Sequence, residues 1–184
     1  ISSTGKYPEV IDRIEAAAIT TATRKLDLEQ IRAAQAQGGL NGHVPFSAIT
    51  AGIALIEAIL RGKRRVLAAM ESSSDEPNTV IDGYEVNHMY SKTYQFEQAL
   101  NDYIHNYIAR DIDFISVVRP FGDLRIAELF AEKSWPRYKD LFASCNIANY
   151  KQGSDDGRLS WCGECSKCAP THSFYLLRLL PTTN

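Results

Sequence analysis

RRVLAAMES, residues 64–72, decides the fold, because it is a short apolar run with a helical pattern on either side of it. The run itself predicts a buried strand. FSAITAGIALIEAIL, residues 46–60, predicts an almost wholly apolar helix that is covered on most sides. Residues 95–110 predict an amphipathic helix, and DFISVVRP, residues 113–120, predicts the next strand. The apolar face expected for the helix at 95–110 consists of Phe96, Ala99, Leu100, Tyr103, Ile104, Tyr107 and Ile108.

The rest of the chain continues this alternation. Residues 7–18 predict a helix and residues 18–24 a strand. A helix follows Asp27, which is its expected N-cap, and stops at Gly38-Gly39. Alternating helices and strands predict an α/β fold with a doubly wound parallel sheet covered on both faces. Further short helices are expected at DLRIAELFAE, residues 123–132, and RYKDLFA, residues 137–143, whereas SSSDEPNTVIDGYEVNHMYSK, residues 72–92, predicts a long polar loop.

The composition and net charge are those of an ordinary globular protein, and they exclude few classes of function. The 184 residues carry 20 basic and 22 acidic side chains, a net charge of −2, which favours neither a nucleic-acid partner nor a membrane surface. No apolar run is long enough for a membrane span, and residues 1–10 lack a signal-peptide pattern. We therefore expect a cytoplasmic protein, and in the cytosol clustered cysteines are typically metal ligands or redox groups rather than disulfides.

The four cysteines have metal-ligand spacing. CGECSKC, residues 162–168, contains two overlapping Cys-x-x-Cys knuckles, and Cys145 is the remaining cysteine of the chain. Four thiolates with none to spare favour a closed, tetrahedral, structural Zn²⁺ site. An iron–sulfur cluster is a chemically valid alternative, and free or redox-active thiols are another. The expected metal ligands are Cys145, Cys162, Cys165 and Cys168.

The conspicuous polar segments follow the predicted strands. ESSSDEPN, residues 71–78, and RPFGDLR, residues 119–125, come directly after the two apolar runs, and NGHVP, residues 41–45, precedes the apolar helix. Ligands of open parallel sheets bind beyond the carboxyl ends of the strands. The sequence therefore predicts a ligand crevice at these segments.

Six ordered motifs carry a family resemblance: LNGHVPFSA, ESSSDEPN, VNHMYSKTYQFE, RPFGDLRIAELF, FASCN and WCGECSKC. In this order they resemble UDP-N-acetyl-α-D-muramoyl-L-alanyl-L-glutamate epimerases, from Leu40 to Cys168. The cysteine segment also resembles, more distantly, 7-cyano-7-deazaguanine synthases of the ATP-pyrophosphatase (PP-loop) group. That group has an adenine nucleotide alpha hydrolase-like fold.

The resemblance implies an ATP- and Mg²⁺-dependent epimerase of peptidoglycan precursor synthesis. Its substrate would be UDP-MurNAc-L-Ala-L-Glu, whose terminal L-glutamate is inverted to D-glutamate after its carboxylate is activated by adenylation. It further implies that residues 1–140 are a nucleotide-binding domain and that residues 141–184 are a zinc-binding segment packed on it. The Ser-Gly-Gly-Lys-Asp-Ser type phosphate loop of the group is absent from this sequence. We expect that the first strand, loop and helix of the fold are lacking, or that they lie upstream.

Particular residues suit this chemistry. Lys92 and Arg119 are the expected contacts for phosphate or substrate carboxylate, and Glu71 and Asp75 are candidate Mg²⁺ ligands. His88 and His43 are the candidate acid/base groups, because imidazole exchanges protons near neutral pH. Candidate nucleotide or sugar contacts are Gly42, Ser73, Asn78 and Asn87. Each has an ordinary alternative as a surface charge or a turn residue, and Tyr103 and Tyr107 are expected in the core.

Two rival functions remain open at this point. One is another PP-loop enzyme, which acts on a deazaguanine or a tRNA base. The other is a non-catalytic binding module stabilised by zinc.

Overall fold

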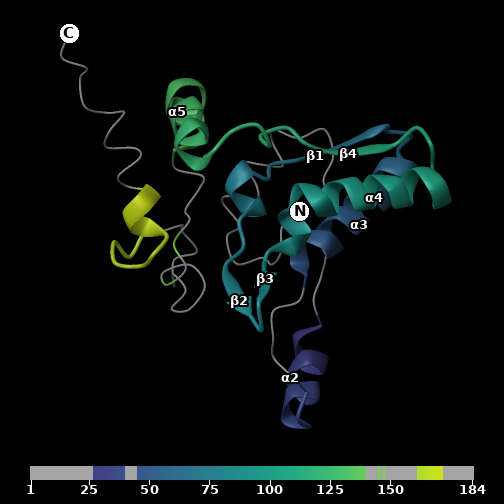
Figure 1. Ribbon diagram of the computed structural model, residues 1–184, viewed down its shortest axis with the longest axis horizontal. Coiled ribbons are helices and arrows are strands. Elements are labelled where there is room, and N and C mark those ends of the chain that lie inside the picture. The colour runs from purple at the N-terminus through teal and green to yellow at the C-terminus, as the bar shows by residue number, and fades with distance from the viewer. Residues whose placement is uncertain (1–26, 40–44, 140–144, 146, 148–160, 172–184) are drawn as a thin grey trace. The chain divides into compact units, whose positions relative to one another are not determined.

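The computed structural model describes residues 27–39, 45–139, 145, 147 and 161–171 (Figure 1). The chain divides into two compact units, one of which is Arg32–Asp123. The other unit contains the cysteine segment. The helix and strand predicted at residues 7–18 and 18–24 lie outside the described residues.

Two parallel strands form the sheet of the Arg32–Asp123 unit. Strand β1 (Arg65–Ala68) pairs with β4 (Asp113–Ser116) in the register Arg65↔Asp113. Helices α3 (Phe46–Leu60) and α4 (Tyr94–Tyr107) accompany them in the order α3, β1, α4, β4. Both strands and both helices were predicted, and the parallel pairing confirms the α/β class.

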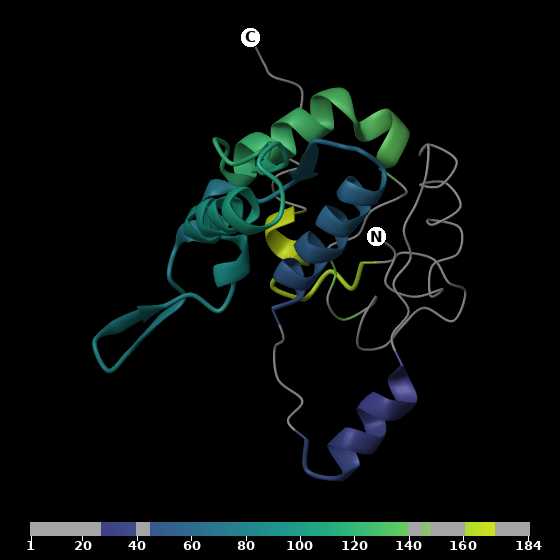
Figure 2. The ribbon, with the colours of Figure 1, turned by 90° about the vertical axis from the view of Figure 1, so that its right-hand side faces the viewer.

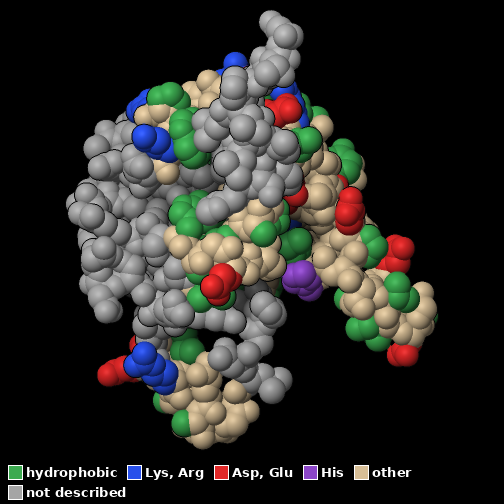
Figure 3. All heavy atoms as spheres, turned by 90° about the vertical axis from the view of Figure 1, so that its left-hand side faces the viewer, with side chains coloured by type: hydrophobic (Ala, Val, Ile, Leu, Met, Phe, Trp, Pro, Cys, Tyr) green, Lys and Arg blue, Asp and Glu red, His purple; other side chains and the backbone are tan. Residues whose placement is uncertain are grey.

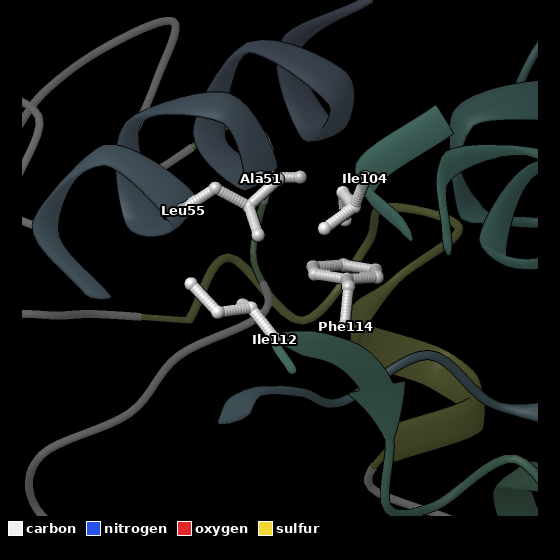
Figure 4. Packing of buried hydrophobic residues seen from close by; sticks show 5 residues of the cluster. All are labelled: Ala51, Leu55, Ile104, Ile112 and Phe114. Atoms are coloured by element: carbon white, nitrogen blue, oxygen red, sulfur yellow. The ribbon is translucent and has the colours of Figure 1, made fainter. Parts of the chain in front are cut away.

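The core of this unit lies between the sheet and the two helices. Figure 4 shows Ala51 and Leu55 of α3 gathered with Phe114 of β4, Ile112 before it and Ile104 of α4. Ile104 is fully buried and Phe114 is 2% exposed. Burying such side chains contributes about 1.5–3 kcal/mol each, so this cluster is the main hydrophobic support of the unit.

Polar side chains of α4 bind the outer edge of β4. Asn101 donates from Nδ2 to the carbonyl of Phe114 at 2.8 Å, and its Oδ1 accepts the amide of Phe114 at 2.8 Å. One turn away, Glu97 Oε1 accepts the amide of Ser116 at 3.1 Å. These bonds occupy the positions that a neighbouring strand would use, because alternate residues of a strand direct their amide and carbonyl groups to the same side.

His105 extends the same row by one more turn of α4. Its Nε2 lies 3.1 Å from the Ile112 carbonyl oxygen and 3.0 Å from Asp113 Oδ1. Both partners are acceptors, so Nε2 carries the hydrogen. The row Glu97, Asn101, His105 therefore closes this edge, and any further strand of the sheet must pair with β1.

The opposite face of the sheet is exposed. Leu67 is 63% exposed, Val117 is 51% exposed, and Ile115, the register partner of Leu67, is 36% exposed. The prediction that residues 64–72 form a strand is confirmed, but the prediction that this strand is buried is wrong. Both helices of the unit pack on the face of Val66 and Phe114, so side chains alternate between core and surface.

The expected burial of α3 is also wrong. Ala51, Leu55 and Ala58 are buried, whereas Ile56 is 59% and Leu60 is 76% exposed. Only one side of α3 packs on the sheet. Its other apolar side chains are exposed, because no other described element covers them.

The apolar face predicted for α4 is wrong in part. Ile104 is buried, but Tyr103 and Tyr107 are exposed and contact each other, with ring centroids 5.3 Å apart. The side of α4 that meets β4 is the polar row, because hydrogen bonds to the strand edge set the rotation of the helix.

The segment predicted as a long polar loop contains a hairpin. Strands β2 (Thr79–Ile81) and β3 (Tyr84–Val86) pair antiparallel, and Figure 2 shows the hairpin extending away from α3 and α4. Asp82 and Gly83 both have positive φ, 52° and 83°, as a two-residue type I′ turn requires. Two short 3-10 helices flank it, η1 (Ser72–Asp75) and η2 (Tyr90–Lys92).

The remaining helices begin near their predicted positions. Helix α2 (Leu28–Ala36) starts after Asp27, whose Oδ1 accepts the Gln30 amide at 3.0 Å, which confirms the N-cap. Helices α5 (Asp123–Lys133) and α6 (Trp135–Tyr138) follow β4, and the last residues of the helix predicted at 137–143 lie outside the described part. Among the described helices, none is long and apolar enough to cross a membrane.

Charge is spread rather than concentrated on the visible surface. On the face drawn in Figure 3, acidic, basic and hydrophobic side chains of the described residues are interspersed. This distribution agrees with the net charge of −2.

Asn101→Leu tests the closure of the β4 edge. The substitution should lower the free energy of unfolding by about 2–4 kcal/mol, because it leaves both polar groups of Phe114 without partners. Urea denaturation followed by circular dichroism measures this change. Asn106→Leu is the matched control, since Asn106 is exposed and bonds only the Asp102 carbonyl of its own helix. Equal losses in the two variants would contradict the edge-closing role.

Candidate functional site

Arg119 joins the segments that follow β1 and β4. Its Nη1 donates to the Glu71 carbonyl at 3.1 Å, and its Nη2 donates to the Lys92 carbonyl at 2.9 Å. Glu71 lies three residues after the end of β1 at Ala68, and Lys92 ends η2. Three residues predicted for the site are therefore brought together by hydrogen bonds, near the carboxyl ends of the parallel strands.

The guanidinium of Arg119 is paired with Glu97. Its Nη2 lies 3.0 Å from Glu97 Oε2, and the two side chains are only 13% and 9% exposed. Asp75 Oδ2 lies at 3.7 Å from Nη1. The positive charge of Arg119 is thus balanced within the protein, and its donors point at protein acceptors.

An open cavity of about 300 Å³ lies beside this network. Its polar lining comes from Ser47 and Thr50 in the first turns of α3, together with Glu71 and Lys92. Aliphatic and aromatic side chains, including Phe114, line the rest. A mostly apolar cavity with a few convergent polar groups is the common form of a small-molecule site.

Lys92 is the cation of the cavity wall. Its ammonium contacts the Met89 sulfur at 3.7 Å, and it forms no ion pair with the described residues. Glu71, on the same wall, accepts the Ser74 hydroxyl at 2.9 Å with Oε1. A cation without a counter-ion next to the amino end of a helix favours an anionic ligand group.

The other acidic and hydroxyl candidates organise the surrounding loop. Asp75 Oδ1 accepts the amide of Tyr94 at 2.6 Å and so caps α4. Thr93 caps the same helix, because its Oγ1 accepts the Phe96 amide at 3.1 Å. Ser73 donates to Asp123 Oδ2 at 3.3 Å.

The asparagine candidates hold the hairpin to the site. Asn87 donates to the Ser74 carbonyl at 2.8 Å and accepts the Met89 amide at 2.8 Å. Asn78 Oδ1 accepts the amide of His88 at 3.1 Å. His88 is exposed at the foot of the hairpin.

Gly42 and His43 lie outside the described residues, so their assignments stay predictions.

The four cysteines converge in the second unit. Their Sγ atoms all lie within 4.8 Å of one another, and the described residues offer no other group of three or more metal-ligating side chains. The Sγ–Sγ distances are 3.5 Å for Cys165–Cys168, 3.8 Å for Cys162–Cys168 and 4.0 Å for Cys145–Cys165. Four sulfurs 2.3 Å from a tetrahedral Zn²⁺ are about 3.8 Å apart, so the arrangement fits that ion.

Backbone groups support the cysteine knuckle. The amides of Cys165 and Glu164 donate to Cys162 Sγ at 3.3 and 3.4 Å. Gly163 makes this turn with φ +78°, which residues with a side chain rarely adopt. Burial raises the pKa of the Cys168 thiol to about 11, so without a cation this thiol stays protonated at neutral pH.

The family follows from sequence comparison. The family model described as the MurL N-terminal domain matches residues 3–117, more than half of the chain. This chain belongs to the MurL N-terminal domain family. The match confirms the resemblance drawn from the motifs and extends it to the segment before Leu40. It includes α3, β1, the hairpin, α4 and β4, and it ends before Arg119.

Curated relatives carry a common name. A UDP-N-acetyl-alpha-D-muramoyl-L-alanyl-L-glutamate epimerase of Xanthomonas oryzae pv. oryzae (strain MAFF 311018) is 36% identical over 145 residues, which are 79% of this chain and 31% of that protein. The epimerase of the same name from Salinispora tropica (strain ATCC BAA-916 / DSM 44818 / JCM 13857 / NBRC 105044 / CNB-440) is 34% identical over 146 residues, 79% of this chain and 30% of that protein. The chain thus spans less than a third of the length of these relatives. No solved structure matches it.

Sequence reasoning missed Glu97 and the cavity hydroxyls Ser47 and Thr50. Glu97 stands one position after Phe96 in a helix judged by its apolar residues, and its partner Arg119 is 22 residues away. A signal did exist in this MurL N-terminal domain chain, because Glu97, Asn101 and His105 are polar residues at a spacing of four.

Cys168→Ser tests the cysteine site. Purified protein should contain about one zinc ion per chain, and the variant should lose most of it and melt at lower temperature, because metal binding is coupled to folding. Metal analysis and a thermal melt give both quantities. Ser166→Ala, in the same turn and exposed, is the control and should keep its zinc. Wild-type protein that is brown with iron, or fully folded without zinc, would contradict the assignment.

Proposed function

We propose that the protein is an ATP-dependent epimerase that inverts the terminal L-glutamate of UDP-MurNAc-L-Ala-L-Glu to D-glutamate, in peptidoglycan precursor synthesis. The names of the relatives support an epimerase that acts on this substrate, and the ATP dependence rests on the resemblance to PP-loop enzymes. Within the chain, the supporting observation is the cavity at the carboxyl end of β1, which is lined by Lys92, a cation with no ion pair among the described residues.

The chemistry explains why such a site needs a cation. The α-proton of glutamate is hard to remove because the adjacent carboxylate is anionic. ATP with Mg²⁺ would supply an activated, uncharged form of this carboxylate. The site must then hold the phosphate oxygens of ATP close to the substrate carboxylate, and all of these groups are negative. Cations that stabilise such charge often make the largest single contribution to the rate enhancement of an enzyme.

We assign roles within the cavity on contacts and charge. Lys92 binds an anionic oxygen of the nucleotide or of the substrate, because its ammonium is unpaired among the described residues. Glu71 is the fitting Mg²⁺ ligand, since Mg²⁺ with a nucleotide typically takes one or two carboxylates plus phosphate oxygens. Asp75 fits less well, because its oxygens are used by the Tyr94 amide and lie near Arg119.

We retain His88 as the proton-transfer residue. It is exposed on the segment between β3 and η2, and its amide is held by Asn78. An exposed imidazole near the cavity segments can reach a bound substrate and exchange its proton with water. The four cysteines are assigned to structural Zn²⁺, which leaves no ligand position open for catalysis.

The proposed activity has a direct assay. Protein of full natural length, incubated with ATP, Mg²⁺ and UDP-MurNAc-L-Ala-L-Glu, should yield D-glutamate after acid hydrolysis and chiral chromatography, and none without ATP. Lys92→Met should reduce kcat/KM about 10- to 100-fold, the usual effect of losing one charged hydrogen bond. Lys63→Met, at an exposed position after α3, is the matched control and should match wild type. Absence of D-glutamate from the wild-type reaction would refute the proposal.

His88→Gln separates activation from inversion. The variant should still release pyrophosphate from ATP with the L-glutamyl substrate present. It should lose about 100-fold or more of its α-proton exchange with deuterated water, because glutamine cannot act as a base. Mass spectrometry follows exchange, and a coupled assay follows pyrophosphate. Parallel loss of both would place His88 in binding or activation, and retention of both would make it a turn residue.

A further inference from the structure

We propose that Arg119 is a positioning residue: held by Glu97, it fixes the main chain at Glu71 and Lys92 and thereby sets where the Lys92 ammonium meets an anionic ligand. The inference rests on the proposed function, because it takes the cavity beside Lys92 as the ligand site. It gives Arg119 a task different from direct contact with phosphate or carboxylate.

The contacts of Arg119 carry this inference. Its guanidinium donates to the main-chain carbonyls of Glu71 and Lys92, at 3.1 and 2.9 Å. These are the carboxylate and the cation of the cavity wall. One planar guanidinium therefore fixes the distance between two backbone positions that bear the opposite charges of the site.

Glu97 fixes Arg119 in turn. Its Oε2 accepts from Arg119 Nη2 at 3.0 Å, and its Oε1 accepts the Ser116 amide at 3.1 Å. Ser116 is the last residue of β4, so the chain of contacts runs from the sheet to the cavity. Neither carboxylate oxygen of Glu97 is available to a ligand.

Energetics argue against a role in stability alone. Burying an ion pair costs desolvation of both charges, and apolar side chains of similar volume often stabilise a protein as well or better. The pair of Arg119 and Glu97 is nevertheless almost fully buried. What apolar side chains could not supply is directional bonding to two main-chain carbonyls.

Lys92 needs such support because nothing else described orients it strongly. Its ammonium meets only the neutral Met89 sulfur, at 3.7 Å. The amides of Tyr90, Lys92 and Thr93 bond carbonyls within the same turn, at 2.7–3.1 Å, whereas the Arg119 bond joins the Lys92 carbonyl to the segment after β4. Releasing the carbonyl would let the ammonium move, and small displacements of a binding group have large effects.

A double-mutant cycle tests the inference. Arg119→Lys keeps the charge beside Glu97 but cannot bond both carbonyls. The four proteins are wild type, Arg119→Lys, Lys92→Met and the double variant, each at full natural length. Calorimetric titration measures their dissociation constants for inorganic pyrophosphate with Mg²⁺ and, separately, for UDP-MurNAc-L-Ala-L-Glu. The probe weakened by Lys92→Met identifies whether phosphate or the substrate carries the anion.

Positioning predicts that the two substitutions are not additive. For the identified probe, Arg119→Lys should raise the dissociation constant about tenfold when Lys92 is present and less than about twofold in the Lys92→Met background. The same variant should raise the KM of the matching substrate, ATP for the pyrophosphate probe or UDP-MurNAc-L-Ala-L-Glu itself, more than it lowers kcat. Additive effects would mean that Arg119 contacts the ligand itself and would overturn the inference. No effect of Arg119→Lys, or of Lys92→Met on either probe, would also overturn it.

Controls separate this result from misfolding and from failure of the proposed reaction. Arg64→Lys changes the exposed Arg64–Asp111 pair, 3.5 Å apart, and should leave binding unchanged. Glu97→Gln takes the place of Arg119→Lys in the cycle if the latter does not fold, with the same non-additivity expected. Intact probe binding and coupling without D-glutamate formation would refute the epimerase proposal and leave the positioning role supported.

Discussion

The carboxylate of Glu97 accepts the Ser116 amide with one oxygen and the Arg119 guanidinium with the other. The first bond belongs to the fold and the second to the candidate site. A buried carboxylate needs such partners, because an unpaired charge in the interior costs several kcal/mol. Its presence on α4 therefore requires that the helix lie against the edge of β4 and that the turn after β4 bring Arg119 back. Helix, strand and site are fixed together by this single side chain.

The position of α4 against β4 also determines at which edge the sheet can take a further strand. Main-chain groups at a strand edge must be hydrogen-bonded, and at β4 the side chains of Glu97, Asn101 and His105 do this instead of another strand. Among the described residues, no strand pairs with the other edge, that of β1. A further parallel strand would have to pair there, and the exposed Leu67 and Val117 lie on the face of the pair that α3 and α4 do not cover.

Sequence reasoning recovered what local pattern determines. The N-cap Asp27, the bounds of α3 and the strands at 64–72 and 113–120 follow from composition and spacing over a few residues. The cysteine group was predicted equally well, because two ligand knuckles are encoded within seven residues. The hairpin was missed although Asp82-Gly83 between TVI and YEV is its local signal, because the surrounding polar residues suggested a loop.

Other features were beyond local reasoning because they depend on distant partners. The rotation of α4 was predicted from its apolar residues, and Tyr107 was placed in the core, where the structure has it 77% exposed. Hydrogen bonds to β4 determine the rotation instead, and they involve residues 13 to 19 positions away. Ser47 and Thr50 enter the site only because α3 packs beside β1, which their sequence neighbours do not encode.

Arg119 shows what the position of a residue in the sequence leaves undecided. A basic residue at the end of a parallel strand was expected to contact phosphate or carboxylate, whereas its guanidinium bonds the main chain of two residues that line the cavity. Its charge is balanced by Glu97 and approached by Asp75, so the charged side chains that line the cavity are Lys92 and Glu71. Coulomb attraction falls with distance and with compensation by nearby opposite charges. An arginine whose charge is balanced acts on a ligand site mainly through the hydrogen bonds that it makes. Those of Arg119 fix the main chain at Glu71 and Lys92, the two charged residues of the cavity wall.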